Sequence, residues 1–357
     1  MYIKPLFILS LLVLAHRTSN GQNWNSFNPS PDWHVTALYV DTTSDLLYIG
    51  GEFIFVGNKQ TNRIATWNGN NWDSLSTGFN EFNLSHGTHP TAIRRFNDKI
   101  YVSGNFQTAG GASAPWIAMW DGMTWDSLPF SVNDAPGNMK VWNNELYVYG
   151  VFDSAGNTVA NGLAKWSGIS WSEVNSLPNF NASTLGYNQI FCIENYQNEL
   201  YIGGIFWGDS NRINIARWNG SNWLSVGNGV SGAFAGISSM TVYHNELYVA
   251  GLFFQADGNA GNSIMKWNGI NWSDVGGGIG GLSFPQVHEM KIINNELYIV
   301  GIFNTAGNIP ARNIAKWDGT KWCALGGFFD NRILTIEQYH DTIIIGGGFW
   351  SMTEIVA

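Results

Sequence analysis

The sequence predicts an all-β protein built from repeated four-stranded antiparallel sheets, and two repeated patterns carry this prediction. A pair of tryptophans five residues apart recurs six times along the 357 residues. A strand-like run that ends in glycine and phenylalanine precedes every pair and occurs a seventh time near the C-terminus. The phenylalanines lie roughly 46 to 54 residues apart. This period is typical of propeller blades or solenoid coils rather than of helical repeats of ~34 to 40 residues.

Each tryptophan pair predicts a tight hairpin, because an Asn-Gly, Asp-Gly or Ser-Gly step between the two indoles supplies the positive φ of a short turn. If Asn68-Gly69 is a two-residue turn, Trp72 lies opposite Ala65. The indoles of Trp67 and Trp72 are then diagonal neighbours on one side of the sheet. We expect all twelve indoles to be core rather than a sugar-binding groove. The pairs are Trp67/Trp72, Trp120/Trp125, Trp166/Trp171, Trp218/Trp223, Trp267/Trp272 and Trp317/Trp322.

Two further strands precede each tryptophan pair. The run that ends in Gly-Phe is the second strand of a unit, and a shorter apolar run upstream is the first. The two tryptophans mark the third and fourth strands. The third strands are apolar on both faces, which predicts that they are buried between neighbouring sheets. The phenylalanines that end the second strands are Phe53, Phe106, Phe152, Phe206, Phe253, Phe303 and Phe349.

The two ends of the chain complement each other. Residues 22–27 match the fourth strand of a unit, with no earlier strand of a unit before them. The seventh unit has its first two strands but only eight residues after Phe349, so its loop is shortened or the sequence continues beyond it. A ring in which the strand around Trp24 completes the C-terminal sheet explains both ends, whereas an open solenoid needs capping. We predict a seven-bladed β-propeller of four-stranded antiparallel blades, closed by the N-terminal strand, as one domain over residues 22–357.

Residues 1–21 have the pattern of an export signal peptide. Lys4 precedes an apolar stretch from Leu6 to Ala15, and small or polar residues follow at positions 19–21. The stretch is too short to span a bilayer, and nothing later resembles a membrane span. We therefore expect a protein that is secreted or held at the cell surface. The alternative is that this segment is a buried N-terminal strand that only resembles a signal.

The composition argues against several classes of function. A net charge of −9 with 17 Lys and Arg does not favour nucleic-acid binding. The seven histidines are scattered, and His86 and His89 have no Cys or acidic partner nearby in the sequence, so we expect no metal and no cofactor. The sequence singles out no catalytic residue. We expect a monomer.

The repeats also resemble a known family. Hydrophobic residues, a glycine pair as at Gly50-Gly51, Gly203-Gly204 and Gly346-Gly347, and tryptophans across a hairpin are similar to the kelch repeats of β-propellers, including the central domain of galactose oxidase. The form GxF…AGN…IAxWxGxxW is similar to repeats of secreted, surface-associated bacterial proteins and fungal cell-end marker proteins. The resemblance covers about 330 residues and implies a propeller. It does not imply oxidase activity, because the Tyr-Cys crosslink and the two copper histidines of galactose oxidase cannot be placed in this sequence.

The lengths of the loops indicate a working face. Connections between the first and second strands and between the third and fourth are minimal, and both kinds lie on one side of a propeller. The other side carries the long connections, for example 106–116, 152–161 and 276–286, and binding residues are often found on such loops. For each aromatic residue or histidine near these loops, packing within the loop is the alternative to ligand contact. The candidate binding residues are Trp33, His34, Trp116, Trp207, Phe234, Phe284, His288 and Trp350.

Three functions follow from these features. Our first expectation is an exported, non-enzymatic propeller that presents its long-loop face to a protein or a glycan. The alternative is a secreted carbohydrate-active enzyme, a lyase or hydrolase, with a site at the mouth of the central channel. A purely structural surface protein is the third. Charged residues and histidines clustered around the channel would favour the enzyme, and repeated loop aromatics would favour a lectin-like binder.

Overall fold

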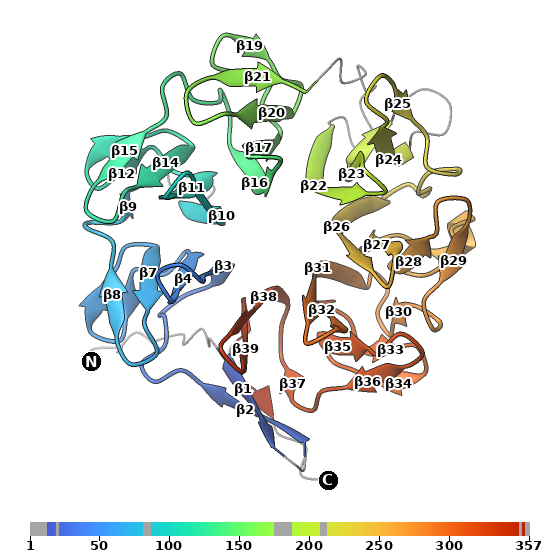
Figure 1. Cartoon of the computed structure of the whole chain (residues 1–357). Helices are drawn as coiled ribbons and strands as arrows, with labels where there is room; N and C mark the ends of the chain where they lie inside the picture. Colours follow the sequence, from blue (N-terminus) through green and yellow to red (C-terminus); the bar gives the residue numbers. More distant parts are fainter. Residues whose placement is uncertain are drawn as a thin grey trace, which may run out of the picture.

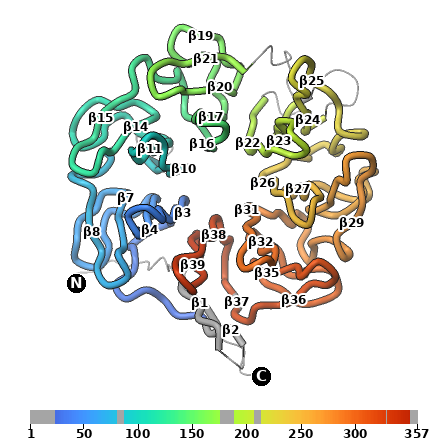
Figure 2. Tube along the Cα trace, viewed as in Figure 1, coloured from blue at the N-terminus to red at the C-terminus, as the bar shows by residue number. Residues whose placement is uncertain are grey.

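The computed structural model describes residues 13–18, 21–80, 87–174, 188–207, 213–349 and 352–353. The described chain is all-β, and most of it forms four-stranded antiparallel sheets that stand around a central axis (Figure 1). Seven such sheets are present. The arrangement is propeller-like, and β3 and β38, which belong to the first and last units along the sequence, lie next to each other (Figure 2).

The first and second strands of each sheet form the part nearest the axis. The first strands are β3 (Val35–Asp41), β10 (His89–Phe96), β16 (Pro136–Trp142), β22 (Gln189–Tyr196), β26 (Gly236–Tyr243), β31 (Gln286–Ile293) and β38 (Ile333–Tyr339). The second strands are β4 (Leu46–Gly51), β11 (Lys99–Asn105), β17 (Glu145–Gly150), β23 (Glu199–Trp207), β27 (Glu246–Leu252), β32 (Glu296–Ile302) and β39 (Thr342–Gly347).

The third and fourth strands lie farther from the axis. The third strands are β7 (Ile64–Trp67), β14 (Ile117–Trp120), β20 (Leu163–Trp166), β24 (Ile213–Trp218), β28 (Ile264–Trp267), β35 (Ile314–Trp317) and, next to β39, β1 (Val13–Thr18). The fourth strands are β8 (Trp72–Ser74), β15 (Trp125–Ser127), β21 (Trp171–Glu173), β25 (Trp223–Leu224), β29 (Trp272–Asp274), β36 (Trp322–Ala324) and β2 (Gly21–Ser26).

Two-residue turns join the first strand to the second in six of the seven sheets, and residues 42–45 make this connection in the first sheet. Asn143 and Asn144, like Asn294 and Asn295, both have positive φ, as a type I′ turn requires. Asparagine tolerates this conformation better than most residues, because its short polar side chain can hydrogen-bond locally. These turns therefore hold the register of the inner hairpins.

The register of the tryptophan hairpins differs from the one that the sequence suggested. Trp67 pairs directly with Trp72, not diagonally, and Ala65 pairs with Ser74. The connection is a four-residue turn in which Asn68 Oδ1 accepts the backbone N–H groups of Asn70 and Asn71, at 3.0 and 2.8 Å. This side-chain capping stabilises a longer turn than the Asn-Gly step alone indicates.

The last sheet combines the two ends of the chain. Its order is β2-β1-β39-β38. Val13 of β1 pairs with Ile345 of β39 on one side and with Ser26 of β2 on the other. Trp24 thus lies in a sheet with the C-terminal strands. Residues 13–18, which the sequence places in an export signal, form a third strand here.

Short strands fill many of the long connections. In the second sheet, β12 (Thr108–Ala109) pairs both with β13 (Ala112–Ser113) and with β9 (Phe79–Asn80), which precedes that sheet. The other short strands are β5 (Phe55–Val56), β6 (Lys59–Gln60), β18 (Ser154–Ala155), β19 (Thr158–Val159), β30 (Ile279–Gly280), β33 (Thr305–Ala306), β34 (Ile309–Pro310), β37 (Phe328–Phe329) and β40 (Met352–Thr353), with one 3-10 turn, η1 (Gln255–Asp257). Much of the long-loop face is therefore ordered backbone.

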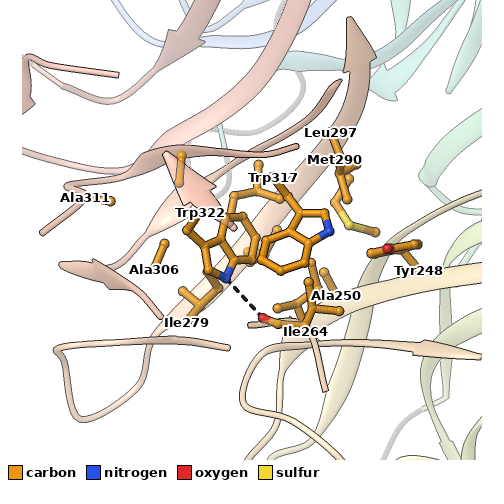
Figure 3. Close-up of a cluster of buried hydrophobic side chains, with 14 of the residues drawn as sticks. Tyr248, Ala250, Ile264, Ile279, Met290, Leu297, Ala306, Ala311, Trp317 and Trp322 are labelled. Atoms are coloured by element: carbon orange, nitrogen blue, oxygen red, sulfur yellow. Dashed lines mark hydrogen bonds between the residues drawn. The ribbon is translucent and has the colours of Figure 1, made fainter. Parts of the chain in front are cut away.

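The core lies between neighbouring sheets. Trp317 and Trp322 pack against Ile264 and Ala250 of the preceding sheet (Figure 3). The indole N–H of Trp322 donates to the Val275 carbonyl at 3.0 Å. Seven of the twelve paired indoles are buried, while those of Trp67, Trp120, Trp171, Trp218 and Trp272 are partly exposed. The prediction of a tryptophan core is thus met in full by only some members of the pairs.

Candidate functional site

The first strands line a central cavity of about 550 Å³. Each first strand has a β-bulge near its beginning, and the bulged residue lies toward the long-loop end of the cavity, because that is where the first strands start. Bulges redirect side chains and are frequent beside functional sites. The bulged residues are Thr36, Thr91, Gly137, Phe191, Ser238, His288 and Leu334.

Hydroxyl groups at these bulges tie neighbouring sheets together. Thr36 donates to the Pro90 carbonyl at 2.6 Å, and Thr91 donates to the Pro136 carbonyl at 3.0 Å. Each bond joins one first strand to the next. The wall of the cavity is therefore cross-linked at its mouth.

Charged side chains project into the middle of the cavity from one register position of the first strands. Lys140 pairs with Glu194 at 2.5 Å, and Lys291 pairs with Glu337 at 2.8 Å. Each ion pair bridges two neighbouring first strands. The charges are thereby largely neutralised in place.

Glu289 is a third carboxyl in the cavity wall. Its Oε2 accepts the Ile336 backbone N–H of the next first strand at 3.0 Å. Burial raises the pKa of Glu289, although Lys291 and the hydrogen bond with Ile336 oppose the shift. A buried carboxyl with a raised pKa can hold a proton closer to neutral pH than an exposed one.

His288 is the bulged residue beside Glu289. Burial, and then the positive charge of Arg332, lower its pKa to about 4. Its Nε2 is buried and has no hydrogen-bond partner within the described part of the chain. The imidazole is therefore neutral at physiological pH.

Trp33, His34 and Glu52 form a compact group at the same end of the first sheet. The Trp33 indole N–H donates to Glu52 Oε2 at 2.9 Å, and His34 Nδ1 lies 3.6 Å from the same oxygen. The rings of Trp33 and His34 are stacked with centroids 5.1 Å apart. Burial lowers the pKa of His34, Glu52 opposes this, and Arg332 adds to it. The positive charge of Arg332, an exposed residue, thus lowers the pKa of both His34 and His288.

Phe234 and Phe284 come together from two separate interblade loops. Their ring centroids are 6.3 Å apart with an interplanar angle of 89°. Phe234 is 55% exposed and Phe284 is 58% exposed. Phe254 lies just after β27, and its ring centroid is 6.3 Å from that of Phe284. This group, Phe234, Phe254 and Phe284, is here called the aromatic corner.

The remaining candidates from the sequence are not gathered at one place. Trp116 packs against the core between the second and third sheets, so it is largely a loop-packing residue. The side chain of Trp207 and the whole of Trp350 lie outside the described residues. Of the eight candidates, Trp33, His34 and His288 lie at the mouth of the cavity, Phe234 and Phe284 lie in the aromatic corner, and Trp116 packs against the core.

Sequence reasoning missed Arg332, Glu52 and the charged ring of the cavity. Aligning the seven first strands would have revealed the ring, because Arg94, Lys140, Glu194, Lys291 and Glu337 occupy one register position.

Two absences hold within the described residues. No group of three or more His, Cys, Asp or Glu side chains there could hold a metal ion. No helix in that part of the chain is long and apolar enough to cross a bilayer.

Comparison with known proteins does not assign the chain to a family. No protein-family model and no curated protein matches it. A solved structure described as "Structure of YjhT" is similar, with 14% sequence identity, a TM-score of 0.47, and coverage of 83% of this chain and 97% of that chain. A similarity at this level carries no argument about activity.

Proposed function

We propose that the seven sheets form a closed, kelch-like seven-bladed propeller. Support comes from a hydrogen bond that recurs between sheets. The indole N–H of Trp125 donates to the Leu75 carbonyl at 3.0 Å, three residues past the tryptophan of the preceding fourth strand. Trp24 makes the equivalent bond to the Leu325 carbonyl at 3.1 Å. The N-terminal fourth strand is thus joined to its neighbour as are the fourth strands of Trp125, Trp272 and Trp322.

A second recurring bond supports closure on the short-turn face. Tyr243 at the end of a first strand donates to the Asn295 carbonyl in the next turn, at 3.1 Å. Tyr339 at the end of the last first strand donates to the Asp45 carbonyl of the first sheet, at 3.0 Å. The same type of contact therefore bridges the two ends of the ring.

On this scaffold we propose an exported, monomeric binding protein that presents its long-loop face to a protein or a glycan and performs no chemistry on it. The observation that carries the proposal is the exposure of Phe234 and Phe284, whose rings come from two separate loops and meet at the surface. Contiguous exposed apolar groups on a rigid scaffold mark interaction sites. The Lys-Glu pairs of the cavity are consistent with a structural role there.

A secreted carbohydrate-active enzyme is the second candidate, and Glu289 and His288 favour it. A carboxyl with a raised pKa can donate a proton, and a neutral imidazole can accept one. Both groups lie in the cavity wall. This candidate predicts that Glu289→Gln abolishes turnover of a bound glycan while retention of the glycan persists.

The proposal is tested by screening the purified protein on glycan and protein arrays and recovering the retained ligand for mass spectrometry. We expect an unchanged ligand. Asn144→Gly and Asn245→Gly, which fit the positive φ of the short turns, should leave retention intact. Loss of retention in these short-turn variants would place the binding site on the short-turn face. Formation of a product from the ligand would favour the enzyme.

Export is tested separately by N-terminal sequencing of the secreted protein, which we expect to begin at Gln22. A leader that ends at Gly21 and a third strand at Val13–Thr18 exclude each other in the mature chain. Trp24 keeps its anchors in either case, because its bond to Leu325 and its ring contact with Phe329 do not involve β1. A mature N-terminus before Val13 would contradict the prediction that residues 1–21 are an export signal.

A further inference from the structure

We propose that the aromatic corner binds the apolar face of a neutral, soluble oligosaccharide. This inference rests on the proposed function and deepens it, because it names the ligand class and the residues. The corner lies where the loop before β26, the segment after β27 and the loop before β31 meet. Leu282, two residues before Phe284 in the same loop, is also 42% exposed.

Hydrogen bonds join two of the segments that carry the corner. The Ser231 backbone N–H donates to Asn259 Oδ1 at 2.9 Å, and Asn259 Nδ2 donates back to the Ser231 carbonyl at 2.8 Å. Ser231 Oγ donates to the Asp257 carbonyl at 3.0 Å. The loop of Phe234 and the segment of Phe254 are therefore joined. A platform ordered before binding loses little entropy when a ligand arrives.

The size of the corner favours a sugar over a protein partner. A stable protein interface buries about 800 Å² on each side. Each phenylalanine offers at most ~200 Å², and almost half of Phe234 and Phe284 is already covered. A few sugar rings match this area without requiring any further apolar surface.

The chemistry around the rings is also that of a sugar. The C–H groups on one face of a pyranose are slightly positive and fit the negative face of an aromatic ring. Gln255 and Asp257 in η1 are exposed beside the rings and offer amide and carboxylate groups to hydroxyls. The Asp257 carboxylate reaches the Phe234 loop, since a Cβ on Gly232 would lie 2.6 Å from its Oδ2.

The charge of the corner points to a neutral glycan. Segments 231–235, 254–260 and 281–285 contain one carboxylate, Asp257, and no Lys, Arg or His. An acidic sugar would therefore meet like charge with no cation to compensate within these segments.

The ring angles point to a soluble chain. Phe284 is inclined by 89° to Phe234 and by 65° to Phe254, so the three rings cannot lie together on a flat crystalline polysaccharide. They form a corner that fits a single chain.

The test is an array of short neutral oligosaccharides of gluco, manno, galacto and xylo configuration, with uronate-containing and sialylated glycans and an insoluble crystalline polysaccharide for comparison. We expect retention by at least one neutral oligosaccharide. Phe284→Ala should weaken its affinity by about tenfold or more. Phe130→Ala is the matched control, because Phe130 is an exposed phenylalanine, at 75%, in a different loop. Both variants should melt within about 2 °C of the parent, since neither side chain is core.

Several outcomes would overturn the inference. They are retention of acidic glycans or the crystalline polymer alone, no retention of any neutral oligosaccharide, and neutral binding that Phe284→Ala leaves unchanged or that Phe130→Ala weakens equally. If a ligand is instead lost on Arg332→Ala at the channel mouth, the aromatic corner is excluded while binding at the long-loop face survives. If no protein or glycan of any class is retained, both proposals fail.

Discussion

At the scale of single residues, burial shifts the pKa of ionisable side chains in the cavity wall. Glu289 and His288 are neighbours in β31, yet burial raises the pKa of the carboxyl and lowers that of the imidazole. In both cases the charged form is disfavoured. These two groups thus differ from the Lys-Glu pairs beside them, in which each charge has a partner.

The shifted pKa of His288 predicts a pH dependence of stability. An unfolded chain protonates this histidine near pH 6.5, whereas the folded chain does so only at about 4. Between these values the unfolded state binds more protons, so the free energy of unfolding falls as the pH is lowered through this window. The contribution is at most about 1.4 kcal/mol per pH unit. Urea denaturation at pH values near 7 and 5 should show a larger loss for the parent than for His288→Gln, and equal losses would contradict the assignment.

Burial also predicts which tryptophans contribute most to the free energy of unfolding. Trp322 is buried and its indole N–H is bonded to Val275, so Trp322→Ala should cost about 3–5 kcal/mol of unfolding free energy through the cavity it leaves. Trp171 holds the equivalent position, is partly exposed, and its Nε1 has no described hydrogen-bond partner. Trp171→Ala should cost clearly less. Chemical denaturation of both variants provides the comparison, and equal costs would show that exposure does not rank them.

At the scale of elements, a left-handed residue connects the long loop to the third strand in several units. Asn313, with φ of 68°, immediately precedes β35. Its Oδ1 accepts the Phe303 N–H at 2.9 Å, and its Nδ2 donates to the carbonyls of Phe329 and Asn331. One buried amide thus joins the second strand, the third strand and the following interblade loop.

Asn313→Ala should therefore destabilise the protein by about 2–4 kcal/mol, because buried polar groups lose their partners and alanine is strained at this φ. Asn308→Ala, in the exposed turn of the same connection, is the control and should change stability by less than about 0.5 kcal/mol. Thermal or urea melts measure both. A negligible effect of Asn313→Ala would mean that the bonds form equally well with water.

At the scale of the whole molecule, the closed ring that we propose depends on the N-terminal strand. Trp24 is 1% exposed and packs edge-to-face on Phe329 at 5.4 Å. Sheets in a closed ring have both faces covered, so loss of one fourth strand exposes two neighbours at once.

Trp24→Ala should consequently cost about as much as Trp322→Ala, about 3–5 kcal/mol. Hydrogen exchange should also show faster exchange in β38 and β39 than in β26 and β27, because the last sheet loses its anchor. A variant that melts like the parent would show that this strand does not contribute to the ring.

The sequence by itself determined the all-β class, the number of repeated units and the strand order within each unit, because these depend on local periodicity and on turn residues such as Asn143 and Asn144. The pairing of Trp67 with Trp72 needed the structure, since side-chain capping by Asn68 lengthened the turn beyond its Asn-Gly signal. The group around Trp33, His34 and Glu52, the ion pairs of the cavity, and the meeting of Phe234 with Phe284 were decided only by tertiary structure. The ion pairs of the cavity and the meeting of Phe234 with Phe284 join residues from different sheets or separate loops, and the distance between such residues depends on how the sheets pack around the axis, which no local pattern encodes.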